Sequence, residues 1–464
     1  MLSHGEVERQ RSASRLPPHT RRSTGDGNPC NREAFPYNAA SWPRYSLRIR
    51  RSKQKRFMEE GPVGKDFCEF FAGIGLVDEA LRRSGWQCGY ANDIDAKKRQ
   101  MYEGNYGPSP HYHEGDVWRV DEVIARIPGR PFLATASFPC TDMSLAGKRK
   151  GLAGEQSGSL FGFLQVIEQL AERRPRAVLL ENVPGFLTSH DGRDFATAVN
   201  ELAALGYWVD SFIIDAQWFV PQSRPRMFLV GYQADLLSPP LVVKPKGSKN
   251  GDANDPWHAA ILAAEKLRPA RLRAAMETID PATGWATIDC GNPSVLRLTI
   301  SDVIEFGDDQ AWWEQAEVDR HYAMMFDRHA EQVEALRARR GQPVALTAFR
   351  RVRLGQQRME VRFDGVAGCL RTPRGGSAKQ IILALINGEL RMRWMTPREY
   401  ARLQGAGDYA LPVNTIQGLF GFGDAVCVPV IEWIDRHMLT PVFEAAEGFS
   451  GQGSGFGKKP IAAS

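Results

Sequence analysis

Between residues 66 and 231, short apolar runs alternate with segments of helical periodicity. The run 131–136 is bounded by prolines and predicts a buried strand, although periodicity alone does not separate it from a buried helix. Further strands are expected at 66–71, 86–92, 176–180, 208–215 and 227–231, with helices at 76–85, 160–173 and 192–205. This alternation predicts a Rossmann-like α/β fold with a doubly wound, mostly parallel sheet.

After residue 235 the pattern changes. Residues 237–260 are rich in Pro, Gly, Asp, Asn and Lys, and residues 311–340 predict one amphipathic helix. Short strands with interleaved Arg and Gly follow at 345–386, which predicts a second, smaller and irregular β-rich domain. Clustered arginines on strands and loops suit phosphate and guanine contacts, although a solvated basic face has the same composition.

Charge is concentrated at the amino end of the chain. Residues 1–56 hold 11 Arg and 2 Lys against four acidic residues, so 13 − 4 = +9, and the remainder carries 5 − 9 = −4. Residues 1–60 lack hydrophobic periodicity and are expected to be a disordered basic leader. A transit peptide, a phosphate-binding tail and translation from Met58 are all open, and we expect the leader to be dispensable. The Gly/Ser-rich tail 446–464 is also expected to be disordered.

Cysteine usage argues against zinc and disulfides. The seven cysteines are scattered and never spaced Cys-x-x-Cys, which indicates a reducing compartment and no metal site. His111 and His113 have no cysteine partner nearby and are expected in a surface loop. No run of about 18 apolar residues occurs, so no membrane span is predicted.

Two stretches suggest chemistry at the ends of predicted strands. Cys140 follows Pro139 just after the run 131–136, where open α/β sheets bind ligands, although a lone cysteine is more often buried and inert. Gly73-Ile74-Gly75 lies between a strand and a helix, and Asp93 follows 93 − 73 = 20 residues later, a spacing that suits a ribose hydroxyl. The missing third glycine favours a nucleoside cofactor without phosphates.

Other polar groups recur at predicted strand ends. Asp116 lies in a turn where its carboxylate could accept a hydrogen bond from an adenine amino group. Glu181 ends the predicted strand 176–180, and a plain salt bridge with Arg224 or Arg226 is the alternative interpretation. The loop after Cys140 is rich in Gly and Lys, which suits a lid over a polyanion or a solvated linker.

Taken together, the motifs and their order are similar to those of a known protein family. They are Phe71-Ala72-Gly73-Ile74-Gly75, Phe138-Pro139-Cys140, Glu181-Asn182-Val183, Gln222-Ser223-Arg224-Pro225-Arg226, Thr396-Pro397-Arg398-Glu399 with Leu403-Gln404-Gly405, and Gly423-x-x-Val426. In this order and at these separations, over about 66–232 and 366–440, the chain resembles the cytosine-carbon-5 DNA methyltransferase family.

The resemblance implies a division of the chain and a set of roles. It implies a catalytic domain at 61–235 plus 390–445 and a target-recognition domain at 236–389. Cys140 would be the nucleophile that attacks cytosine carbon 6, Glu181 would hold the base, and Arg226 with Arg224 would hold the cytosine carbonyl oxygen and the loop. The target base would be flipped out of duplex DNA.

The resemblance also implies S-adenosylmethionine (S-adenosyl-L-methionine) as cofactor. The residues expected around it are Phe71, Gly73, Ile74, Gly75, Asp93, Ile94, Asp116, Val117, Pro139, Asp424, Ala425 and Val426. Two positions depart from the family pattern. Ile94 replaces an aromatic residue that often stacks on adenine, and Asp424-Ala425 replaces the usual Asn-Ser, which lowers the expected affinity for the cofactor.

Three functions follow as hypotheses. The first is a sequence-specific cytosine methyltransferase acting on double-stranded DNA, in a restriction–modification or related defence system with a cognate restriction endonuclease, located in the cytoplasm with the nucleoid. The second is a tRNA cytosine-5 methyltransferase, but that branch carries a Cys-Phe-Thr element and residues 183–221 contain no cysteine. The third is a catalytically inactive DNA-binding relative, motivated by Asp424-Ala425.

Overall fold

The computed structural model describes most of the chain between residues 64 and 448. The described ranges are 64–139, 158–244, 255–279, 284–295, 298–339, 341–373, 378–412 and 414–448. The expected leader, Cys140 with the Gly- and Lys-rich loop after it, and residues 449–464 of the expected tail lie outside these ranges.

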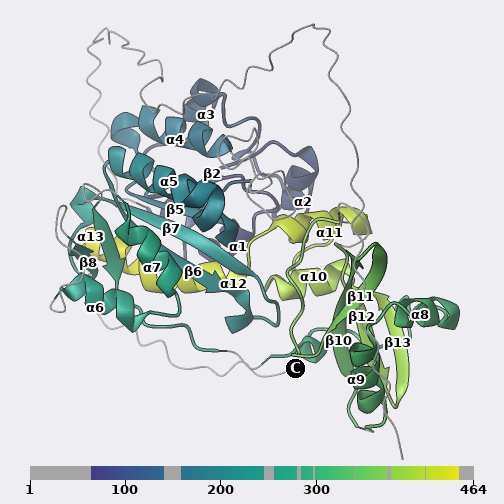
Figure 1. Cartoon of the computed structure of the whole chain (residues 1–464). Helices are drawn as coiled ribbons and strands as arrows, with labels where there is room; N and C mark the ends of the chain where they lie inside the picture. Colours follow the sequence, from purple (N-terminus) through teal and green to yellow (C-terminus); the bar gives the residue numbers. More distant parts are fainter. Residues whose placement is uncertain are drawn as a thin grey trace, which may run out of the picture. The chain divides into compact units, whose positions relative to one another are not determined.

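A large sheet organises the described part of the chain (Figure 1). Within the described residues it has nine strands in the order β3-β2-β1-β4-β5-β7-β6-β9-β8. The strands from β3 to β5 run parallel to their neighbours, whereas β7 is antiparallel to β5 and β6. The strands are β1 (Asp66–Phe70), β2 (Gln87–Asp93), β3 (Tyr112–Glu114), β4 (Leu133–Ser137), β5 (Ala177–Asn182), β6 (Tyr207–Asp215), β7 (Pro225–Gln233), β8 (Leu241–Lys244) and β9 (Trp285–Ile288). The expected doubly wound α/β sheet is confirmed.

Helices cover both faces of this sheet, because successive side chains of a strand point to opposite faces. On β1, Phe67 packs in one apolar cluster and Phe70 in the other. The α-helices of the described residues, including α8 and α9 that pack elsewhere, are α1 (Leu76–Arg82), α2 (Ala96–Tyr106), α3 (Val120–Arg126), α4 (Ser159–Gln169), α5 (Arg193–Ala204), α6 (Pro256–Ala263), α7 (Ala270–Glu277), α8 (Gln315–Tyr322), α9 (Asp327–Arg337), α10 (Pro397–Leu403), α11 (Thr415–Asp424), α12 (Val428–Ile434) and α13 (Thr440–Ala446).

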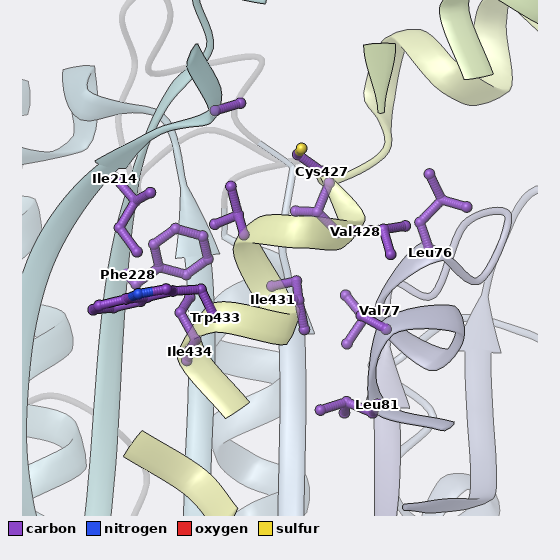
Figure 2. Packing of buried hydrophobic residues seen from close by; sticks show 14 of the residues in the cluster. Leu76, Val77, Leu81, Ile214, Phe228, Cys427, Val428, Ile431, Trp433 and Ile434 are labelled. Carbon is purple, nitrogen blue, oxygen red and sulfur yellow. The ribbon is translucent and has the colours of Figure 1, made fainter. Parts of the chain in front are cut away.

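The carboxyl-terminal helix α12 completes the core that the amino-terminal helix α1 begins. Figure 2 shows Leu76 and Val77 of α1 beside Ile431 of α12, with Ile214 of β6 and Phe228 of β7 packed against the same helix. All five side chains are buried. Segments more than 350 residues apart in sequence therefore form one hydrophobic core, which explains why the catalytic domain is expected in two pieces.

A second, four-stranded antiparallel sheet has the order β11-β10-β12-β13 (Figure 1). Its strands are β10 (Val344–Arg353), β11 (Gln356–Arg362), β12 (Ile381–Ile386) and β13 (Glu389–Trp394). Buried side chains of α8 and α9, such as Val318 and Val333, pack against it around Met392. This sheet corresponds to the smaller β-rich region expected from the Arg- and Gly-rich strands.

The single helix expected at 311–340 is wrong, because the chain forms the two helices α8 and α9 there. Phe326, between them, has extended backbone angles of φ −76° and ψ 147°. Just before it, the carbonyl of Met324 accepts a hydrogen bond of 2.9 Å from the backbone N–H of Met359 on β11. The backbone here therefore bonds to β11 instead of continuing the helix. Helical periodicity in the sequence does not reveal such a contact between distant segments.

The expectation that His111 and His113 lie in a surface loop is also wrong for His113, whereas His111 lies in the turn just before β3. His113 lies on β3 and is 8% exposed. Its ring bonds to the hydroxyl of Tyr90 and to Glu122, both at 3.0 Å. His111 is half-buried and bonds to the hydroxyl of Tyr102 at 2.9 Å. The neighbouring strand and helix supply these partners, so the two rings support the sheet.

The boundaries expected at 235/236 and 389/390 do not coincide with the limits of the two sheets. Strands β8 and β9 lie beyond residue 236 and still belong to the large sheet. At the other limit, Glu389 begins β13, which pairs along its length with β12. The segment that reads DNA thus stays a prediction, and the separate small sheet spans residues 344–394.

Candidate active site

The carboxyl ends of the parallel strands meet at one edge of the large sheet. Asp93 at the end of β2 pairs in register with Glu114 of β3, and Ser137 at the end of β4 pairs with Glu181 of β5. The Phe138-Pro139 step follows the end of β4, and Glu181-Asn182 forms the end of β5. The edge is where open α/β sheets bind ligands, and it is the candidate site.

The glycine turn after β1 has the geometry that its sequence predicts. Phe71, Gly73 and Gly75 all have positive φ, at 57°, 59° and 79°. A Cβ on Gly75 would lie 2.4 Å from the ring of Tyr102, so packing requires glycine there. A Cβ on Gly73 would make only ordinary contacts of 3.9 Å with Lys98 and with the carbonyl of Phe71, so the positive φ, and not crowding, favours glycine there.

Asp93 holds this turn in place. Its Oδ2 accepts a hydrogen bond of 2.9 Å from the backbone N–H of Gly73, and its Oδ1 accepts one from Asp95. The ammonium group of Lys98 lies 3.8 Å from Asp93 and 3.4 Å from Asp424. The structure thus brings Asp93 and Asp424 to the same lysine.

The remaining expected cofactor residues divide by exposure. Ile94 is 71% exposed at the strand end, whereas Ile74, Val117 and Val426 are buried apolar residues. Asp116 uses one carboxylate oxygen to accept from the backbone N–H of Trp118 at 3.0 Å. Among these positions, side chains open to a ligand are therefore found at Ile94 and, in part, at Asp116.

Cys140 itself lies outside the described residues, but the chain leading to it is described as far as Pro139. The carbonyl oxygen of Phe138 accepts a hydrogen bond of 3.2 Å from the side-chain amide of Asn182. This bond fixes the start of the cysteine loop to the residue that follows Glu181. The Phe-Pro-Cys and Glu-Asn-Val motifs are therefore joined at their bases.

Glu181 and Arg226 form an ion pair at the end of β5, with 2.9 Å between Oε1 and Nε. Both side chains are largely buried, at 13% and 15% exposure. Burial raises the pKa of the Glu181 carboxyl, against the opposing charges of Arg226 and Arg224. The salt bridge considered from sequence is present, with Arg226 as the partner.

Arg224 points into the protein. It is 2% exposed, and its Nη atoms donate to the main-chain carbonyls of Leu370 at 2.9 Å and of Ala425 at 2.7 Å. Gln222, two residues earlier, donates to the carbonyl of Leu403 at 2.7 Å. These two side chains tie the 222–226 segment to the Gly423–Val426 turn and to the strand-connecting segment near residue 370.

Cys369 is a site residue that the sequence motifs do not indicate. Its sulfur lies 3.4 Å from Arg224 Nη1 and 3.9 Å from Arg226 Nη2. Burial alone would raise the pKa of this thiol, but the two guanidinium groups outweigh burial and hold the pKa below its usual range. The partners lie more than 140 residues away in sequence, so no local pattern reports the contact.

Among the described residues, one group of metal-ligand residue types occurs, next to the amino ends of β2 and β3. Atoms of Asp78, Cys88 and His111 lie within 4.8 Å of one another. The Asp78 carboxylate is already held by two hydrogen bonds of 2.7 Å from Arg82 and by the hydroxyl of Tyr102. The Asp78 carboxylate is therefore already paired with Arg82, and this ion pair explains the cluster.

A doubly wound sheet with a glycine turn, an acidic residue after β2 and a buried Glu–Arg pair after β5 defines an α/β enzyme that binds its ligands at the strand ends. A family model described as C-5 cytosine-specific DNA methylase matches residues 66–440. The chain belongs to this family and is a DNA cytosine methyltransferase.

Similar proteins of known type include bacterial modification enzymes. The chain is 26% identical to the type II methyltransferase M.HpaII of Haemophilus parainfluenzae, over 80% of this chain and 88% of that protein. It is 25% identical to M.HhaI of Haemophilus parahaemolyticus, over 80% and 93%. It is 37% identical to M.BsuFI of Bacillus subtilis over a shorter stretch, 37% of this chain and 40% of that protein.

A solved structure supports the fold. The Entamoeba histolytica methyltransferase EhMeth superposes with a TM-score of 0.52 at 13% identity, covering 82% of this chain and 98% of that chain.

Within the described residues, none of the helices has both the length and the apolar character to cross a membrane.

Proposed function

We propose that the chain transfers a methyl group from S-adenosylmethionine to carbon 5 of a flipped-out cytosine in a specific sequence of duplex DNA. The observation that carries the proposal is the paired Glu181 and Arg226 at the strand end beside the base of the Cys140 loop. The type II relatives support a role in modification, with a cognate endonuclease as partner and DNA in the cytoplasm as substrate.

The described residues fit the proposed cofactor. The exposed side chain of Ile94 leaves an apolar surface for the adenine at the end of β2. Asp93 would accept from the ribose hydroxyls, and Asp116 from the adenine amino group. Asp424 would accept from the ammonium group of the cofactor and would share that role with its present partner, Lys98. When bound, S-adenosylmethionine supplies an electrophilic methyl group.

Cys140 would act as the nucleophile. Its thiolate forms a bond to carbon 6 of cytosine, which makes carbon 5 enamine-like and able to accept the methyl group. Loss of the carbon-5 proton to water then restores the 5,6 double bond and releases the Cys140 sulfur. A lowered thiol pKa favours the first step, and a positively charged neighbour such as arginine would provide it.

Glu181 and Arg226 would hold the target base during this attack. Because burial raises the pKa of Glu181, its carboxyl group keeps a proton to higher pH than an exposed glutamate does. A protonated carboxyl group can donate to ring nitrogen 3 and relieve the charge that builds up there. Arg226 would bind the carbonyl oxygen of cytosine, and Arg224 would position the surrounding loops.

Methyl transfer with labelled cofactor tests the proposal. Tritium from S-adenosylmethionine is expected in mixed-sequence DNA with the wild-type chain and not with Cys140→Ser, with Cys30→Ser as the matched control. Transfer to tRNA in place of DNA, or to neither, would contradict the proposal. Bisulfite sequencing of the product then identifies the methylated sequence, which should be the sequence that the cognate endonuclease cuts when unmethylated.

A further inference from the structure

The hairpin of β10 and β11 extends beyond the small sheet. β10 pairs with β12 only as far as Ala348, whereas its pairing with β11 continues to Arg353, which lies opposite Gln356. Residues 349–360 therefore form a two-stranded ribbon, which we call the β10–β11 ribbon. Two strands alone are marginally stable in water, so a free ribbon of this length indicates a partner.

The end of the ribbon is exposed to solvent. Residues 351–357 are all exposed, whereas Met359 at the base of the ribbon is fully buried. Val352 and Leu354 are large apolar residues at 71% and 104% exposure. A run of exposed side chains that includes two large apolar ones marks an interaction surface.

The ribbon carries an excess of positive charge. It contains four arginines and one glutamate, so 4 − 1 = +3. Arg351 lies directly opposite Arg358 in the antiparallel register. Like charges in this position destabilise a strand pair, so their presence is explained by an anionic partner that lies across both arms. Arg351 is held over the ring of Phe349, with its guanidinium carbon 4.9 Å from the ring centroid.

The residues of the turn at the tip of the ribbon are not the ones that would stabilise it best. Leu354 and Gly355 form the two-residue loop, and both have positive φ, at 49° and 78°. Loops of this kind favour Asn-Gly, because a leucine at positive φ is strained. A strained, fully exposed leucine at the tip gives no stability to the fold, so its side chain points to a role in recognition.

We propose that the β10–β11 ribbon enters the major groove of the DNA substrate and reads bases there, with Arg351 on a guanine edge and Leu354 on a thymine methyl group. The inference rests on the proposed function, because it assigns the target-reading element of that enzyme. The major groove is about 12 Å wide and admits a two-stranded ribbon. The exposed arm residues 351–353 reach about 10 Å, comparable to the groove depth of about 8.5 Å.

Selection from a pool of random-sequence duplexes tests the ribbon without requiring methyl transfer. The full-length wild-type protein is expected to select one sequence at fixed salt. Arg351→Ala should lower affinity for that duplex about tenfold and relax the selection at a guanine. Arg351→Lys should retain most of the affinity but relax the same position, because lysine keeps the charge without the planar fork.

Arg320→Ala on α8 is the matched control, since Arg320 is an exposed arginine near the same sheet, at 60% exposure. It should select the wild-type sequence. Selection unchanged in Arg351→Ala, or affinity lost equally for every sequence, would overturn base reading by the ribbon. A wild-type protein that selects a sequence but transfers no methyl group would contradict the proposed function and leave the ribbon supported.

Leu354→Asn separates recognition from folding. The substitution places a favoured residue at the turn, so thermal stability should be equal or higher. Selection at a thymine should nevertheless relax, and retained selection at every position would overturn the role of Leu354. Dimethyl sulfate protection of the selected duplex identifies the groove: guanine N7 should be protected by the wild type and exposed in Arg351→Ala, whereas protection at adenine N3 alone would place the ribbon in the minor groove.

Discussion

At the scale of single residues, Arg226 links two ionisable groups of the candidate site. Arg226 contacts both Glu181 and Cys369, so a carboxyl group and a thiol share one guanidinium group. Arg224 adds a second positive charge beside the same sulfur. The carboxyl group of Glu181 and the thiol of Cys369 therefore lie in the field of the same two arginines.

Replacing Cys369 should shift the pH dependence of methyl transfer. In Cys369→Ala the two arginines lose one negative partner, so their field acts more strongly on Glu181 and lowers its pKa. If the protonated carboxyl group is the active form, activity falls at lower pH than in the wild type. The pH profile of kcat measures this shift. Cys427→Ala, at a buried cysteine, is the control and should leave the profile in place. An unchanged profile in Cys369→Ala would show that this charge balance does not matter.

Glu69 on β1 should make the stability of the fold depend on pH. It is 3% exposed, and burial together with the charge of Asp78 raises its pKa well above the usual value of 4.5. A carboxyl group whose pKa is raised on folding stabilises the protein below its unfolded pKa and loses that contribution as pH rises. Glu69→Gln removes the titration, so its advantage in melting temperature over the wild type should grow from pH 5 to pH 8. Parallel melting curves across this range would contradict the account.

At the scale of elements, α10 shows where sequence suffices and where it does not. Thr396 and Pro397 predict the start of the helix, and the structure has Thr396 as N-cap in a capping box with Glu399. The same Glu399 also forms a buried pair with Arg393 of β13, at 2.8 Å, which the cap pattern does not reveal. A helix cap depends on neighbouring residues, so the sequence pattern predicts it. Contacts between elements depend on the packed fold.

The Arg393–Glu399 ion pair, which connects the small sheet to α10, should contribute strongly to the stability of the fold. Both side chains are almost completely buried. Arg393→Met leaves a buried carboxylate without its partner and should lower the free energy of unfolding by about 3–5 kcal/mol. Arg320→Met, in an exposed pair, should cost at most about 1 kcal/mol. Chemical denaturation of both variants measures the difference, and equal losses would contradict a special role for the buried pair.

At the scale of the whole molecule, the sequence pattern predicts where the parallel strands end better than it predicts which sheet the later strands join. The strand-end positions of Asp93 and Glu181 follow from the rule that parallel strands end at one edge. The two helices at 315–337 and the membership of β8 and β9 in the large sheet do not follow, because they depend on bonds between distant segments. Cys369 escapes prediction for the same reason.

The most direct test of the account is covalent capture on a duplex that contains 5-fluorocytosine at the methylated position. With S-adenosylmethionine present, the wild-type chain should form a stable adduct, because fluorine blocks the loss of the group at carbon 5. Digestion and mass spectrometry should place the adduct on the peptide of Cys140, and Cys140→Ser should form none. A DNA adduct on another cysteine, or methyl transfer that persists in Cys140→Ser, would contradict the central claim.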